Sequence, residues 1–60
     1  MLDHKKYYTL VEAAAYLNIK EKTLYAIKDK IPHYRVGRMI RFKREDLDAW
    51  MESLKVFKDV

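Results

Sequence analysis

The 60-residue chain carries 13 Lys or Arg against 9 Asp or Glu, has 50% hydrophobic residues and no Cys, and has a formal net charge of +4. A chain of this length forms one domain with a thin core, which leaves little room for the concave pocket of an enzyme or a small-molecule site. We therefore expect no catalysis and no cofactor. Without Cys the chain forms no disulfide or thiolate metal site. It also lacks a signal-peptide run or membrane-spanning segment, so we expect a cytoplasmic protein.

We expect a single domain over residues 1–60, with flexible ends at 1–6 and 56–60. The first predicted helix begins after Thr9, whose side chain can cap the helix while Glu12 reaches back to form a capping box. It ends near Leu17, because Asn18 tolerates the left-handed conformation that terminates helices. Its apolar face repeats at helical spacing through Leu10, Ala13, Ala14 and Leu17.

A second helix is predicted from Lys20 to Asp29, with Leu24 and Ile27 facing inward. Pro32 blocks further helix and favours extended backbone at Ile31. The opposite face of this helix carries Lys22, Tyr25, Ala26 and Asp29.

The next segment predicts a β-hairpin in which residues 34–36 and 39–42 flank a turn at Gly37 and Arg38. Alternation along these strands leads us to expect four apolar or aromatic residues on the inner face and two cations on the other. The expected inner residues are Tyr34, Val36, Ile40 and Phe42. The expected outer residues are Arg35 and Arg41.

A third helix is predicted over residues 44–55, with a buried stripe of Leu47, Trp50, Met51 and Leu54 and acids on its outer face. Phe57, in the apolar tail that follows, is a candidate contact for a partner. The elements predict a mainly α fold with a small β-hairpin, in the order α-α-β-β-α. Two helices joined by a tight turn and followed by a hairpin constitute a winged helix-turn-helix.

Charge is segregated along the chain. Residues 20–44 contain nine Lys or Arg and two acids, whereas the remainder contains four Lys and seven acids. Such segregation gives the molecule a positive face that attracts a phosphate backbone. We therefore expect double-stranded DNA as the partner, with the second helix in the major groove and Arg38 at the hairpin tip in the adjacent minor groove.

The predicted DNA-binding residues fall into three roles. Lys22 and Thr23 are candidates for base contacts, and Ala26 is expected either to touch a thymine methyl group or to permit close approach of the helix. Tyr25 is expected either to pack against the hairpin or to meet a phosphate. The electrostatic contacts are assigned to Lys20, Lys28, Arg35, Arg38, Arg41 and Lys43.

Three segments carry a resemblance to a known group: TLVEAAAYLNIKEKTLY at 9–25, IPHYRVGR at 31–38 and IRFKREDLDAWME at 40–52. Together they resemble the short excisionase-like DNA-binding proteins, which are related to the winged helix-turn-helix of the MerR superfamily. The connecting AIKDK is shorter than in many of these relatives. The resemblance implies that the hairpin is the wing, and it implies a role in DNA excision, plasmid maintenance or transcriptional control.

Other interpretations remain open. The chain can instead be a protein-interaction module that docks a recombinase or polymerase subunit, or the DNA-binding domain of a longer regulator. Self-association on adjacent DNA sites is a further expected contact. The tyrosines at 7, 8, 16, 25 and 34 suggest base stacking on single strands, although core packing or helix stapling accounts for at least three of them.

Metal and membrane sites are not expected. His4 and His33 have no second ligand at metal-binding spacing. Asp46 and Asp48 lie on different helix faces and cannot form a catalytic pair. No predicted helix combines a Lys-rich face with an unburied apolar one, as an anionic membrane surface would require.

Overall fold

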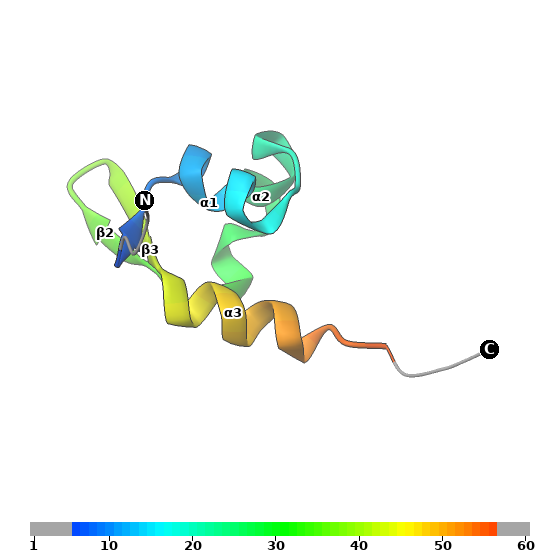
Figure 1. The fold of residues 1–60 in the computed structure, drawn as a ribbon. Coiled ribbons are helices and arrows are strands. Elements are labelled where there is room, and N and C mark those ends of the chain that lie inside the picture. Colours follow the sequence, from blue (N-terminus) through cyan, green and yellow to red (C-terminus); the bar gives the residue numbers. More distant parts are fainter. Residues whose placement is uncertain (1–5, 57–60) are drawn as a thin grey trace, which may run out of the picture.

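The computed structural model describes residues 6–56, which form a mainly helical fold with a small antiparallel sheet (Figure 1). The expected order of two helices, a hairpin and a third helix is confirmed, and a short strand precedes them. The elements are β1 (Tyr7–Tyr8), α1 (Leu10–Leu17), α2 (Glu21–Ile27), the 3₁₀ helix η1 (Lys28–Lys30), β2 (Tyr34–Val36), β3 (Met39–Lys43) and α3 (Arg44–Ser53).

The capping box at the start of α1 forms as predicted. The backbone N–H of Glu12 donates to Thr9 Oγ1 at 3.1 Å, and the N–H of Thr9 donates to Glu12 Oε1 at 3.0 Å. Asn18 ends the helix in the left-handed conformation, with φ 60° and ψ 45°. The N–H of Ile19 then donates to the carbonyl of Ala14 at 2.9 Å, so backbone hydrogen bonds hold the turn between α1 and α2.

The second helix is shorter than predicted, because α2 ends at Ile27 and η1 takes over. Pro32 disfavours helical backbone at Ile31, whose φ of −119° and ψ of 129° are extended. The last turn tightens into 3₁₀ geometry, and the N–H of Ile31 donates to the carbonyl of Lys28 at 3.1 Å. This compact turn is how the short AIKDK connection reaches the hairpin.

The sheet has the strand order β1-β3-β2. In the hairpin, Tyr34 pairs with Arg41, Arg35 with Ile40, and Val36 with Met39. Directly paired residues share a face, so Tyr34 and Arg41 lie together and Arg35 lies with Ile40. The predicted assignment of residues to the two faces of the hairpin was therefore wrong. The two-residue turn pairs Val36 with Met39, and this pairing decides which residues of the two strands share a face.

The inner face of the sheet meets the core through β3. Phe42 is fully buried, and Tyr8, which pairs with it, is half-buried. All three residues of β2 are exposed, so the expected burial of Tyr34 and Val36 was wrong. The buried core consists of Ala13, Ala14, Leu17, Leu24, Ile31, Phe42 and Leu47.

Burial along α3 is uneven. Leu47 is fully buried and Trp50 packs against the core, as predicted. Met51 and Leu54 are exposed, which contradicts the predicted continuous stripe, because the last turns of α3 lead away from the other elements toward the C-terminus (Figure 1). The expected contact at Phe57 lies outside the described residues. Among residues 6–56, no helix is long and apolar enough to cross a bilayer.

Candidate nucleic-acid interface

The exposed face of α2 carries the side chains predicted to contact bases. Leu24 is fully buried, so it fixes the rotation of α2 about its own axis. Lys22, Thr23 and Ala26 are all exposed, and Lys20 is exposed at the N-cap position. The helix therefore presents the short and cationic side chains to solvent and its leucine to the core.

Lys28 is less available than the sequence suggested. Its Nζ lies 4.6 Å from the centroid of the Tyr25 ring and 3.8 Å from Asp29 Oδ1, and its side chain is only 16% exposed. Tyr25 is itself 60% exposed, so it is not packed into the hairpin, and contact with a phosphate is the remaining expectation. The pair of contacts restrains the ammonium of Lys28 and offsets part of its charge through Asp29.

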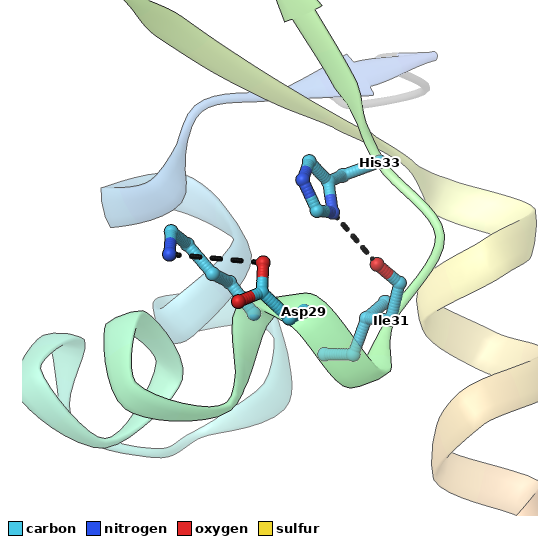
Figure 2. Close-up of polar contacts among 4 residues, drawn as sticks. Asp29, Ile31 and His33 are labelled. Atoms are coloured by element: carbon cyan, nitrogen blue, oxygen red, sulfur yellow. Dashed lines mark hydrogen bonds and ion pairs between the residues drawn. The ribbon is translucent and has the colours of Figure 1, made fainter.

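The connection between η1 and β2 is held by His33. Its Nδ1 lies 2.8 Å from the Ile31 carbonyl oxygen, and Figure 2 shows the ring turned toward that oxygen. A carbonyl only accepts, so Nδ1 is the protonated nitrogen. The ring centroid is also 5.8 Å from that of Phe42, which is buried. These contacts restrain the segment that joins α2 to the hairpin. Within the described part of the chain, no group of three His, Cys, Asp or Glu side chains can hold a metal ion.

The hairpin cations do not share one face. Gly37 has φ +60° in the turn, and Arg38 beside it is exposed at the tip. Arg35 lies on the inner face with Ile40, whereas Arg41 and Lys43 lie on the outer face. One Arg41 guanidinium nitrogen donates to the Ile40 carbonyl at 2.9 Å. Lys43 Nζ lies 3.9 Å from Glu45 Oε1.

The cations of α2 and of the hairpin form two separate groups. Figure 1 shows the hairpin and α2 at opposite sides of α1. Helices α1 and α3 both contact β3, and α1 in turn carries α2. The core side of the sheet therefore points toward the helices, and the outer face, with Arg41 and Lys43, points away from α2.

Sequence reasoning missed β1 and the contacts it brings. Tyr7 pairs with Lys43 and therefore lies on the outer face. Its ring centroid is 5.7 Å from that of Tyr34, and Lys6 Nζ lies 5.7 Å from the Tyr7 centroid. Adjacent tyrosines favour a strand, but two residues are too few for alternation to show.

A shallow groove of about 430 Å³ lies between α1 and α3. At its edge, Tyr16 Oη donates to Asp48 Oδ1 at 2.5 Å. This hydrogen bond is the main reason that the pKa of Tyr16 is raised above its usual value, with smaller effects from burial and from the Asp48 charge. The groove is lined by Tyr16, Leu17, Asp48, Met51 and Glu52.

Comparison with known proteins places these features in context. A family model described as a helix-turn-helix domain matches residues 7–55. The chain is also 33% identical over 55 residues to an uncharacterized protein, YvgK, of Bacillus subtilis (strain 168), a match that covers 88% of this chain and 18% of that protein. The chain thus spans less than a fifth of the length of this relative. No solved structure matches the chain significantly.

Proposed function

We propose that this chain, which belongs to the helix-turn-helix domain family and is thereby a DNA-binding domain, recognises particular sequences in double-stranded DNA as a winged helix-turn-helix. The observation that carries the proposal is the exposed face of α2, where Lys22, Thr23 and Ala26 stand opposite the buried Leu24. An α-helix about 10 Å across fits the major groove, where base pairs are distinguishable by their edges.

Each of these side chains has a chemical role in the proposal. Lys22 donates to the O6 and N7 acceptors of guanine, and Thr23 bonds a base or a phosphate. Ala26 allows the helix backbone to approach a thymine methyl group. Lys20 at the start of α2 contacts a phosphate, and so does Tyr25 through its hydroxyl; Lys28 adds a weaker contribution because Asp29 already pairs with it.

The hairpin supplies a second contact on the same duplex. Because it lies across α1 from α2, its tip is suited to the groove next to the one that α2 occupies. Arg38 is assigned to that minor groove, where A/T-rich sequences concentrate negative potential. Arg35 is assigned to a flanking phosphate, which sets register without reading sequence. Arg41 and Lys43 lie on the outer face of the sheet, so the proposal gives them no part in this duplex contact.

The biological role that fits best is that of an excisionase-like recombination directionality factor or a small transcriptional regulator. A single module of this kind covers only about 600 to 1,000 Å² of its own surface on DNA, which limits its selectivity. Useful specificity therefore comes from another copy on an adjacent site, from a recombinase bound beside it, or from further domains of a longer regulator.

A second candidate function is supported by the groove between α1 and α3, whose lining includes the exposed Met51. In that case the module docks a recombinase or polymerase subunit rather than reading DNA alone. Ionic strength separates the two functions. Binding through about 4 to 6 phosphates has a log-log salt slope near −4 to −5, whereas apolar docking barely responds to salt.

The test is a selection from random-sequence duplexes at two ionic strengths, using the wild type, Lys22→Ala and Arg38→Ala. The wild type should enrich one motif, and Lys22→Ala should change the preferred base at one position at a cost of about 1 to 3 kcal/mol. Arg38→Ala should weaken binding to all duplexes and reduce the salt slope by about one. If the wild type enriches no motif, the assignment of α2 to base contacts is wrong.

A further inference from the structure

The outer face of the sheet is an exposed surface that the duplex contact does not use. The register places six side chains on it, and they combine rings, apolar groups and cations. Among them Tyr7 is 44% exposed, Tyr34 43%, Val36 56% and Met39 51%. The six are Tyr7, Tyr34, Val36, Met39, Arg41 and Lys43.

We propose that this outer face binds single-stranded nucleic acid, with unpaired bases stacking on Tyr7 and Tyr34 and the backbone phosphates held by Lys6, Arg41 and Lys43. Tyrosine rings stack on any base, because every base has a π-face, and neighbouring cations follow the strand's phosphates. This binding site is separate from the duplex contact through α2, and the two can be tested independently.

The tyrosine pair has the geometry of a stacking platform. The two centroids are 5.7 Å apart with the ring planes tilted by 54°. The rings come from β1 and β2, which flank β3 on either side, so the sheet fixes their separation. Two exposed rings held on a rigid sheet offer adjacent surfaces for successive bases at little cost in side-chain entropy.

The charges around the rings select an anionic ligand. None of the residues in β1, β2 and β3 is acidic, and Glu45, the acid that pairs with Lys43 at 3.9 Å from the start of α3, offsets only part of the charge of that one cation. Lys6 Nζ lies 5.7 Å from the Tyr7 centroid, and Arg41 shares the face of Tyr34. Two of these faces brought together in a dimer would oppose Arg41 and Lys43 with their own copies, which disfavours a second copy as the occupant. A polyanion with flat apolar groups complements both features.

The experiment measures fluorescence anisotropy of a labelled oligo(dT) of about 12 nucleotides and, separately, of a labelled duplex. The wild type should bind both. Tyr34→Ala should weaken oligo(dT) binding about tenfold or more while leaving duplex binding unchanged, since one stacking contact is lost. Tyr34→Phe is the matched control, because it keeps the ring and should bind oligo(dT) like the wild type. Ring resonances of Tyr7 and Tyr34 should shift on addition of oligo(dT), a readout that needs no variant.

Four outcomes would overturn the inference, and a fifth would support it while contradicting the proposed function. Wild-type binding to the duplex but not to oligo(dT) would remove it and leave the proposed function intact. Equal oligo(dT) binding by Tyr34→Ala would show charge attraction without stacking. Polyglutamate binding as tight as that of oligo(dT) would assign the face to an acidic protein, and a dimer lost in Tyr34→Ala would assign it to a second copy. Oligo(dT) binding without duplex binding would support the inference and contradict the duplex proposal instead.

Discussion

Tyr16 is a single side chain that joins two helices, because its hydroxyl on α1 donates to the Asp48 carboxylate on α3. Its ring also lies 5.3 Å from that of Tyr8, centroid to centroid. Asp48 is further restrained by Arg44, whose Nε is 4.0 Å from Asp48 Oδ2. The contact is solvent-exposed, so we expect it to contribute well below about 1 kcal/mol to the free energy of unfolding.

The pH dependence of this contribution follows from the raised pKa of Tyr16. The folded state favours the neutral phenol, so the stabilisation is complete below the unfolded value of about 10 and is lost as the pH rises through the higher folded pKa. Tyr16→Phe should therefore be slightly less stable than the wild type at neutral pH and should converge with it in strong alkali. Urea unfolding across the alkaline range measures this, with Tyr25→Phe as the control. A deficit that stayed constant with pH would contradict the account.

Helix α3 is unevenly supported along its length, and this predicts a gradient of mutational effects. Leu47→Ala should cost about 2 to 5 kcal/mol, because the side chain is fully buried, and this is most of the stability of so small a domain. Leu54→Ala should cost less than about 1 kcal/mol, since Leu54 is 52% exposed. Urea titrations followed by Trp50 fluorescence compare the two. Equal costs would mean that the end of α3 is covered in solution.

Elements set by local chemistry were predictable from sequence, whereas the register of the hairpin and the short strand β1 were not. The Thr9 capping box and the left-handed Asn18 depend on neighbours within a few residues, and both are confirmed. The hairpin itself was found, but its faces were reversed for β2, because the spacing across the turn was not used to align the two strands. Strand β1 was missed, since its identity depends on pairing with β3, far along the chain.

For the candidate site, the residues exposed on α2 were predictable from sequence, whereas side-chain contacts and the faces of the hairpin were not. The exposed face of α2 follows from helical spacing, so the exposure of Lys22, Thr23 and Ala26 was predictable. The restraint of Lys28 by Tyr25 and Asp29 was not, because it depends on side-chain conformation. The positions of Arg35 and Arg41 on opposite faces required the strand register.

Across the whole molecule, the structure separates two cationic surfaces. One is the exposed face of α2, and the other is the hairpin, in which Arg35 lies on the inner face of the sheet and Arg41 and Lys43 lie on its outer face. Acidic side chains gather instead on α3, where Glu45 and Asp46 occupy the first turn. In the proposed duplex contact, this distribution would place α3 away from the polyanion and leave the α1–α3 groove uncovered.

The central claim is that α2 and the hairpin tip occupy adjacent grooves of one duplex. The chain has no Cys, so an iron chelate can be attached to the single thiol of Glu21→Cys, beside the exposed face of α2, or of Val36→Cys, beside the turn. On the selected duplex, hydroxyl radicals from the two positions should cut in zones about half a helical turn, or roughly 5 base pairs, apart. The cleavage maxima on the two DNA strands should be displaced from each other. For the Glu21→Cys conjugate the displacement should have the direction typical of a major-groove source, and for the Val36→Cys conjugate that of a minor-groove source. Cleavage of the same base pairs by both conjugates, or by only one of them, would contradict the account.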